Sequence, residues 1–318
     1  MMNLKKPKFW DYKKPNLFAY LLQPIALLIQ LKNIFKVKSD KKKQSIKTIC
    51  IGNIYIGGTG KTSLSIKIND LLIKKNVKSC FIKKFYKNQI DEQKLLESRG
   101  KIFSSAKRLE AIDLASLENY EVAILDDGLQ DMTINYDIKI VCFNDLNWKG
   151  NGLTIPSGPL RESLNNLKNY QHVFINGNSS DEKNLDDIKQ EILKINSNIN
   201  IYMGKYIPLN LAEFNKQDRY LVFSGIGNHQ TFIAMLRNNG LNICKDLEFP
   251  DHYTYSDKDI KKILKLSDEM NCKIITTEKD YFRFNFYKYD KIRFMKSDLK
   301  IDNENKLIHH IINSNEAN

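Results

Sequence analysis

Cysteine and histidine are scarce in the chain, with five of each among 318 residues, and neither type has the spacing of a metal site. The cysteines lie singly in or beside short apolar runs, without Cys-x-x-Cys or mixed Cys/His spacing; they are Cys50, Cys80, Cys142, Cys244 and Cys272. An odd number of dispersed cysteines favours a reducing compartment and argues against a disulfide framework. The histidines likewise predict no metal cluster.

The apolar run Leu17–Leu31 is short for a membrane span. As a helix it would reach roughly 22 Å, against a hydrocarbon core of ~30 Å. It contains Gln23, Pro24 and Gln30, and no small-residue cleavage site follows, which argues against a secretory signal. Lysines flank it on both sides: Lys5, Lys6, Lys8, Lys13 and Lys14 before it, and Lys32, Lys36, Lys38, Lys41, Lys42 and Lys43 after it. This pattern favours a monotopic anchor on an anionic leaflet over a core helix, and leaves open whether the helix spans the membrane or lies on it.

Acidic residues are outnumbered, 37 against 50 Lys plus Arg, which gives a net charge of +13. Such a balance indicates a nucleic acid, an anionic lipid or an anionic substrate, or it reflects a Lys- and Asn-rich genome. Nucleic acid is disfavoured because the basic residues cluster at the apolar run and are not interleaved with aromatics on a strand.

Internal repeats and long low-complexity segments are also missing, and the length favours two domains. Apolar runs alternate with helical periods from Lys47 onward, which predicts a mostly parallel sheet flanked by helices. The predicted strands are Thr48–Ile54, Ser79–Ile82, Lys101–Phe103, Val122–Leu125, Ile138–Phe143, His172–Ile175, Ile201–Ile207, Tyr220–Ser224, Lys273–Thr276 and Ile292–Met295. The predicted helices are Thr62–Lys74, Lys107–Leu117, His229–Asn239, Asp257–Met270 and Asn303–Ile312. We divide the chain into a basic segment 1–46 with the apolar helix 17–31, an α/β domain 47–176, and a smaller α/β domain 177–318.

The segment from Ile51 to Thr62 predicts a phosphate-binding loop. It follows an apolar run and opens a helical stretch, as a P-loop requires. Its glycines let backbone N–H groups turn onto phosphate oxygens, Lys61 would reach the β- and γ-phosphates of ATP, and Thr62 would bind Mg²⁺. The expected nucleotide-binding residues are Tyr55, Ile56, Gly57, Gly58, Thr59, Gly60, Lys61 and Thr62; Tyr55 stands where the usual pattern begins with glycine.

Two carboxylates, Asp126 and Asp127, end the apolar run that begins at Val122. By itself Asp-Asp-Gly is a common turn. Beside a P-loop, acids at the tip of a strand hold Mg²⁺ directly or through water, so the metal role is favoured. The sequence leaves open which of the two acids contacts the ion.

Several blocks together resemble the tetraacyldisaccharide 4′-kinase family, the lipid A 4′-kinases of Gram-negative bacteria, over nearly the whole chain. The blocks are Gly52-Asn53 with Gly-Gly-Thr-Gly-Lys-Thr62, Asp126-Asp-Gly-Leu-Gln130, Asn151-Gly-Leu153, Pro156-Ser-Gly-Pro-Leu-Arg161-Glu162, Ser224-Gly-Ile-Gly-Asn228, Phe249-Pro-Asp-His252, and Thr276-Thr-Glu-Lys-Asp280 with Arg283. The resemblance implies a P-loop kinase at the cytoplasmic face of the inner membrane. It also implies transfer of the γ-phosphoryl group of ATP, with Mg²⁺, to the 4′-hydroxyl of a lipid A precursor, a tetraacylated disaccharide 1-phosphate. No protein partner is implied.

The resemblance also assigns residues at the acceptor site. Asp91, in Asp-Glu-Gln where the family has Asp-Glu-Pro, corresponds to the catalytic base, and His252 to its partner. A carboxylate is suited to accept the proton of a sugar hydroxyl as the P–O bond forms. Tyr86, Asn151, Arg161 and Glu162 correspond to substrate-binding residues. Read alone, His252 would be a surface loop histidine, and Arg161 with Glu162 a loop salt bridge.

Two departures from the family pattern lie near Asp91. The chain has Lys83-Lys84-Phe85-Tyr86 where the family has Ser-Arg-Gly-Tyr, and only 87–90 separate Tyr86 from Asp91. His229 stands where the family often has proline.

The alternative function is a membrane-associated P-loop NTPase that acts as a switch or chaperone without a lipid acceptor. The same phosphate loop and acidic residues would serve that function.

Overall fold

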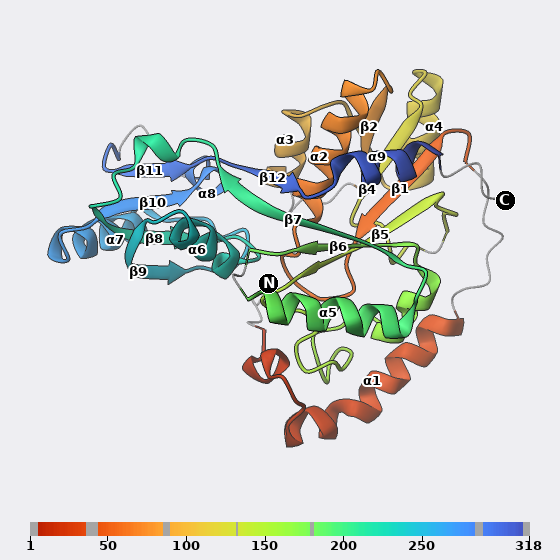
Figure 1. The fold of residues 1–318 in the computed structure, drawn as a ribbon, viewed down its shortest axis with the longest axis horizontal. Coiled ribbons are helices and arrows are strands. Elements are labelled where there is room, and N and C mark those ends of the chain that lie inside the picture. Colours follow the sequence, from red (N-terminus) through yellow and green to blue (C-terminus); the bar gives the residue numbers. More distant parts are fainter. Residues whose placement is uncertain are drawn as a thin grey trace. The chain divides into compact units, whose positions relative to one another are not determined.

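The structure is a computed structural model that describes residues 6–35, 44–84, 90–131, 133–178, 181–283 and 289–313. The chain divides into two units (Figure 1). The larger unit takes the described residues within 1–176, 183–203 and 301–318, and the smaller unit takes those within 177–182 and 204–300. The predicted junction at 177 begins the smaller unit, whereas the segments 183–203 and 301–318, assigned above to the second domain, pack with the larger unit.

An eight-stranded sheet has the order β12-β7-β6-β5-β1-β4-β2-β3. Its six strands from β6 to β3 pair in parallel, as the sequence predicts. The inner strands of this set are buried along nearly their whole length, because helices cover both of their faces, whereas the edge strand β3 is only partly buried. The bounds are β1 Lys47–Gly52, β2 Ser79–Lys84, β3 Ile102–Ser105, β4 Val122–Asp126, β5 Ile138–Asn144, β6 His172–Asn176, β7 Asn200–Pro208 and β12 Ser297–Ile301.

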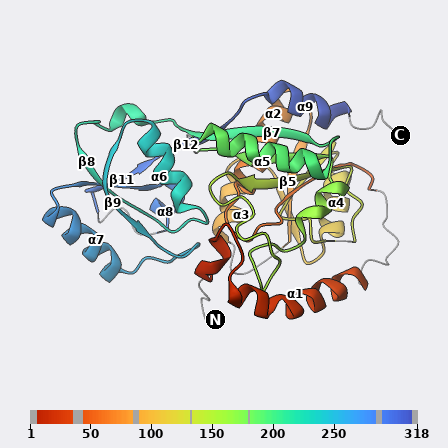
Figure 2. The same cartoon turned by 60° about the horizontal axis from the view of Figure 1, so that its bottom comes forward.

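Helices of the larger unit cover both sheet faces (Figures 1 and 2). Ala111 of α4 and Ile188 of α5 pack in one core with Leu125 and Val173. On the sheet α2 packs against β1, β2 and β4, and it also contacts α9. The bounds are α2 Lys61–Lys74, α3 Ile90–Glu97, α4 Arg108–Leu117, α5 Glu182–Ile195 and α9 Glu304–Asn313, with a 3-10 helix at Leu164–Asn169.

The N-terminal segment forms a 3-10 helix, Lys8–Asp11, and helix α1, Leu17–Phe35. Helix α1 continues through Pro24 and extends beyond the predicted run. Figure 2 shows it alongside the rest of the larger unit. Within the described ranges, no helix combines the length and apolarity needed to cross a membrane.

The smaller unit is a four-stranded parallel sheet with the order β11-β10-β8-β9. Phe232 of α6 packs with Val222 on one side, and Ile260 of α7 packs with Leu221 on the other. The bounds are β8 Arg219–Ser224, α6 His229–Asn238, β9 Asn242–Glu248, α7 Asp257–Glu269, β10 Lys273–Thr277, α8 Glu278–Tyr281 and β11 Ile292–Met295, preceded by a 3-10 helix at Leu211–Glu213. Strand β9 was not predicted, because it lies at the sheet edge and its residues are only half-buried or exposed.

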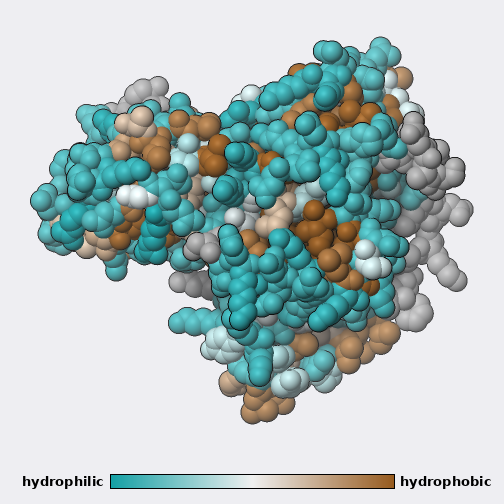
Figure 3. Space-filling model, in the orientation of Figure 1, coloured by the Kyte–Doolittle hydropathy of each residue, from teal (hydrophilic) through white to brown (hydrophobic). Residues whose placement is uncertain are grey.

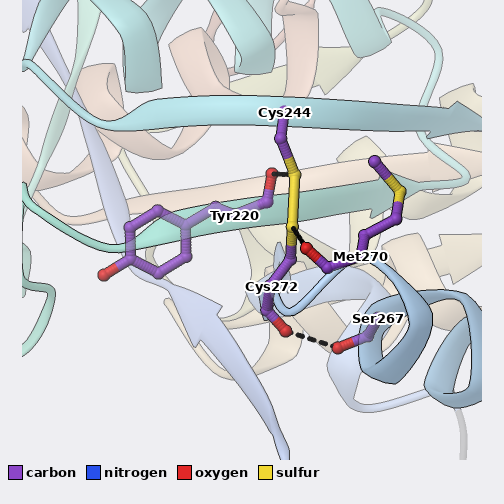
Figure 4. Close-up of a disulfide and its surroundings, with 5 residues drawn as sticks. All are labelled: Tyr220, Cys244, Ser267, Met270 and Cys272. Carbon is purple, nitrogen blue, oxygen red and sulfur yellow. Dashed lines mark hydrogen bonds between the residues drawn. A yellow bond between two sulfur atoms is a disulfide. The ribbon is translucent and has the colours of Figure 1, made fainter.

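One pair of cysteines is joined, although the odd number of dispersed cysteines argues against a disulfide framework. Cys244 and Cys272 are joined in the smaller unit (Figure 4). Cys244 is the extra residue of a bulge in β9, Cys272 directly precedes β10, and both strands flank β8. The sheet order therefore brings together two cysteines whose spacing in the sequence gives no such signal. The other three cysteines are buried free thiols, and burial raises the pKa of Cys80 to about 12.

Candidate active site

The loop between β1 and α2 has the geometry of a phosphate-binding loop. Gly57 and Gly60 have φ values of 127° and 85°, which other residues rarely adopt, and Gly60 is the N-cap of α2. Asn53 Nδ2 braces the loop by donating to the carbonyls of Tyr55 at 2.5 Å and Gly57 at 3.1 Å. The first turn of α2 carries no acidic residue, so the backbone N–H groups there favour an anion.

The hydroxyl of Thr59 in this loop is buried and has no hydrogen-bond partner among the described residues. A buried donor without a partner is unfavourable unless a ligand supplies an acceptor. A phosphate oxygen is such an acceptor. The loop therefore fits the triphosphate of ATP in both backbone geometry and donor chemistry.

Asp126 lies at the carboxyl end of β4, next to the start of α2. Its side chain is 2% exposed. Thr62 Oγ1 donates to its Oδ2 at 3.1 Å, and Ser65 Oγ donates to its Oδ1 at 3.4 Å. A hydroxyl and a carboxylate are the hard oxygen ligands that Mg²⁺ prefers, with phosphates and water completing the shell. The described residues contain no group of three or more His, Cys, Asp or Glu that could hold a metal ion.

Asp127 follows in a left-handed conformation, with φ 58°, and its N–H donates to the Ile51 carbonyl at 2.8 Å. Its carboxylate lies 3.9 Å from Lys61 Nζ and 3.1 Å from Arg161 Nη1. The two predicted metal acids therefore differ: Asp126 is buried beside Thr62, and Asp127 is paired with cations.

The Gly-Pro-Leu-Arg-Glu block is tied to the phosphate loop through backbone pairing. Ile56 N–H donates to the Pro159 carbonyl at 2.8 Å, and Arg161 N–H donates to the Ile54 carbonyl at 2.6 Å. Tyr55 and Leu160 form an isolated antiparallel bridge. This pairing uses the Ile56 N–H, so the nucleotide would meet N–H groups further along the loop.

Arg161 reaches into the site, whereas Glu162 bonds within its own segment and Asn151 bonds to its own segment and to the N-terminal segment. Arg161 Nη1 donates to Gln130 Oε1 at 2.8 Å besides its pair with Asp127. Asn151 Nδ2 donates to the Ser157 carbonyl at 2.9 Å. Glu162 accepts bonds from Asn166 Nδ2 at 2.8 Å and from Tyr170 Oη at 2.7 Å. The salt-bridge alternative is thus present for Arg161, with Asp127 as the partner.

The side chain of Tyr55 engages the N-terminal segment. Its hydroxyl donates to Asp11 Oδ1 at 2.8 Å and accepts from Lys6 Nζ at 2.9 Å. Burial, reinforced by the charge of Asp11, raises the pKa of this hydroxyl. Trp10 Nε1 also donates to the Pro156 carbonyl at 3.0 Å. The segment before α1 is therefore fastened to the two loops that frame the phosphate site.

Sequence reasoning missed three polar residues at this site. Lys83 Nζ lies 3.7 Å from Asp126 Oδ2. Arg108 donates to the Asp127 carbonyl at 2.9 Å, and Gln130 Nε2 donates to the Asn53 carbonyl at 3.2 Å. Gln130 belongs to the Asp-Asp-Gly-Leu-Gln block, which was a usable signal. The sequence gives no such signal for Lys83 or Arg108, because their roles depend on which strands and helices are neighbours.

Three other predicted acceptor-site residues are Asp91, Tyr86 and His252. Asp91 falls in α3, although its side chain is outside the described part, and Tyr86 lies outside the described residues. His252 belongs to the smaller unit and has a φ of 59°. There its ring lies 3.5 Å from Arg283 Nη2 and 3.7 Å from the Asp251 carboxylate.

A parallel sheet with a phosphate loop after β1 and an acid at the tip of β4 defines a nucleotide-binding enzyme of the P-loop class. The family model described as tetraacyldisaccharide-1-P 4′-kinase matches residues 18–316, and the chain belongs to this family. The resemblance drawn from the motifs is thereby confirmed.

Individual relatives agree with this assignment. The chain is 58% identical over 319 residues to the tetraacyldisaccharide 4′-kinase of Pelagibacter ubique (strain HTCC1062), covering 100% of both chains. It is 33% identical to that of Rickettsia canadensis (strain McKiel), covering 96% of both. Among solved structures it resembles apo-form LpxK from Aquifex aeolicus in complex with ATP, with a TM-score of 0.61, 25% identity, and coverage of 92% of this chain and 97% of that one.

Proposed function

We propose that the protein transfers the γ-phosphoryl group of ATP to the 4′-hydroxyl of a tetraacylated glucosamine disaccharide 1-phosphate, forming lipid IVA in lipid A biosynthesis. The observation that carries this proposal is the phosphate loop with Thr62 set against Asp126 and Lys61 against Asp127, in a chain of the tetraacyldisaccharide 4′-kinase family. Phosphoryl transfer depends mainly on positioning and charge stabilisation, which is what these groups offer.

In this proposal the loop N–H groups and Lys61 hold the phosphates. Thr62 and Asp126 hold Mg²⁺, because the two side chains already share a hydrogen bond and Asp126 is buried. Asp127 acts in the outer shell, since Lys61 and Arg161 pair with its carboxylate. When bound, the metal ion neutralises phosphate charge.

On the acceptor side, Asp91 serves as the base and His252 supports it, as the family resemblance implies. Arg161 is suited to the 1-phosphate of the acceptor, because a guanidinium binds phosphate with two parallel hydrogen bonds. Tyr86 completes the proposed acceptor set. Asn151 and Glu162 contribute by shaping the loop that carries Arg161.

The test is transfer of ³²P from γ-labelled ATP to the disaccharide 1-phosphate in detergent micelles with Mg²⁺. We expect a labelled lipid from the wild type and a loss on the order of 10³-fold in Lys61→Ala, since a transition-state charge contact is removed. Asp91→Ala should lose transfer while a fluorescent ATP analogue still binds. ATP hydrolysis without a lipid product in the wild type would instead support the NTPase-switch alternative, and near-normal transfer by Asp91→Ala would reject Asp91 as the base.

We further propose that α1 docks the enzyme on the cytoplasmic face of the inner membrane. The stripe of α1 that faces the protein consists of small or polar side chains together with Leu22, with Ala19 and Ala26 buried and Gln23 and Gln30 half-buried. The large apolar side chains point outward, among them Leu21 at 66% and Leu28 at 67% exposure. Figure 3 shows hydrophobic atoms along the lower edge, where Figure 1 places α1.

This inverted pattern suits an interfacial helix, whose apolar face enters the boundary between headgroups and acyl chains. The exposed Lys13 and Lys14, just before α1, would favour an anionic surface. The double variant Leu21→Glu/Leu28→Glu should lower binding to phosphatidylglycerol-containing vesicles by tenfold or more, on the order of 1 kcal/mol or above per buried leucine. The matched control is Leu117→Glu in α4, which is 79% exposed. Equal vesicle binding by the α1 variant and this control would place the lipid contact elsewhere.

A further inference from the structure

Lys83 is a buried cation beside the phosphate site. It lies on β2, where Ile82 pairs with Leu125, so that Lys83 and Asp126 follow at the same level of neighbouring parallel strands. Its Nζ lies 3.7 Å from Asp126 Oδ2, and the two side chains are 6% and 2% exposed. The same Oδ2 accepts the hydrogen bond from Thr62. The Lys83 ammonium therefore lies near the Asp126 oxygen that also contacts Thr62, the other proposed Mg²⁺ ligand.

A charge buried this deeply requires a compensating partner, because desolvation of an unpaired ion is strongly unfavourable. Asp126 and Lys83 supply that compensation to each other before any ligand binds. Around them, Lys61 and Arg161 pair with Asp127. Among these five described side chains the positive charges outnumber the negative ones by one, which weakens the attraction for a free divalent cation.

We propose that Lys83 is a positioning residue that neutralises Asp126 and so makes Mg²⁺ binding depend on the phosphates of the nucleotide. This inference rests on the proposed metal role of Asp126. An ion bound to Asp126 lies close to the ammonium, and the repulsion at low effective dielectric lowers its affinity. The triphosphate brings enough negative charge to reverse the balance. The site therefore takes up the metal with the nucleotide rather than ahead of it.

The experiment compares Lys83→Met with Lys67→Met, each in the full chain. Lys67 is a suitable control because it is also a poorly exposed lysine of the larger unit, 13% exposed, with Nζ 2.8 Å from Glu304. Two quantities are measured: the melting temperature with and without Mg²⁺ in the absence of nucleotide, and the Mg²⁺ concentration that half-saturates binding of a fluorescent, non-hydrolysable ATP analogue.

We expect Mg²⁺ alone to leave the melting temperature of the wild type and of Lys67→Met unchanged. Lys83→Met should melt lower without Mg²⁺ and recover several degrees when Mg²⁺ is added, because the ion then neutralises Asp126. Its half-saturating Mg²⁺ concentration should fall by about tenfold or more, as expected for removal of one nearby like charge. Lys83→Arg keeps the charge and should respond to Mg²⁺ as the wild type does.

If Lys83→Met does not fold, Lys83→Gln removes the charge with a polar side chain and is judged by the same two measurements. An unchanged Mg²⁺ response in the charge-removing variant overturns the role of Lys83 and leaves the metal site standing. If Mg²⁺ has no effect on nucleotide binding by the wild type, the proposed metal site fails and this inference fails with it.

Discussion

Two buried aspartates, one in each unit, show how similar burial serves different ends. Asp126 follows β4 in the larger unit and Asp280 lies in α8 after β10 in the smaller unit, with side chains 2% and 0% exposed. Asp126 has longer contacts, with Thr62 at 3.1 Å, Ser65 at 3.4 Å and Lys83 at 3.7 Å. Lys83 balances its charge and the two hydroxyls donate to it at these longer distances, which suits an acid that takes up a metal ion.

Asp280 is held by a closer set of donors. Its Oδ1 accepts from Gly225 N–H at 3.1 Å, Tyr255 Oη at 3.1 Å and Arg283 Nη1 at 2.9 Å, and its Oδ2 accepts from Thr277 Oγ1 at 2.7 Å. The bonds join the loop after β8 to the start of α8. A carboxylate saturated in this way stabilises a fold and has little capacity for a further ligand. Asp280 is therefore suited to a structural role, and Asp126 to the metal role proposed above.

The largest expected effect comes from removing the charge of Asp126, the aspartate with the proposed metal role. Asp126→Asn keeps the size of the side chain and removes the charge that Mg²⁺ needs, so lipid phosphorylation should fall on the order of 10³-fold. The ³²P transfer assay measures it, at a temperature where circular dichroism shows the variant folded, because Lys83 also loses its partner. Thr62→Ser is the control, since it keeps the hydroxyl and should stay within a few-fold of wild type. Turnover by Asp126→Asn within tenfold of wild type would contradict the metal role.

The next largest effect tests whether Asp280 stabilises the fold. Asp280→Asn leaves Arg283 without its buried carboxylate and should lower the free energy of unfolding by about 4 kcal/mol. Urea unfolding measures it, and affinity for an ATP analogue should stay unchanged at low urea. The matched control is Asp268→Asn, whose ion pair with Lys291 is exposed and should contribute no more than about 1 kcal/mol. Equal losses in both variants would show that the Asp280 network is not a stabilising one.

His172 differs from the two aspartates in that it is a buried ionisable group that folding keeps neutral. Burial, with a smaller contribution from the charge of His310, lowers the pKa of His172 from 6.5 to about 4. The unfolded chain therefore binds the proton of His172 more readily than the folded chain does. The contribution of neutral His172 to the free energy of unfolding is complete above pH 6.5 and is lost as the pH drops toward 4. The loss should be about 3 kcal/mol, from 1.36 kcal/mol per pH unit. Urea titrations between pH 7 and 4 measure it. His172→Phe should flatten the slope, and a variant as acid-sensitive as wild type would assign the loss to other groups.

Much of the fold could be predicted because its signals are local. The strands from β1 to β6 are short apolar runs, and the predicted boundaries differ from the observed ones by two residues or fewer. The phosphate loop was predictable because the glycines, Lys61 and Thr62 are adjacent in the chain. Strand β9 could not be predicted, since an edge strand with a half-exposed face lacks a continuous apolar run.

The sequence by itself determined the P-loop architecture, the family and the candidate nucleotide site, because each depends on residues that are close together in the chain. Only the tertiary structure decided that Lys83 faces Asp126, that Cys244 meets Cys272, and that α5 and α9 pack with the larger unit. Those outcomes depend on strand order, which places distant segments side by side. Strand order follows from the packing of the whole chain, and local residue patterns do not encode it directly.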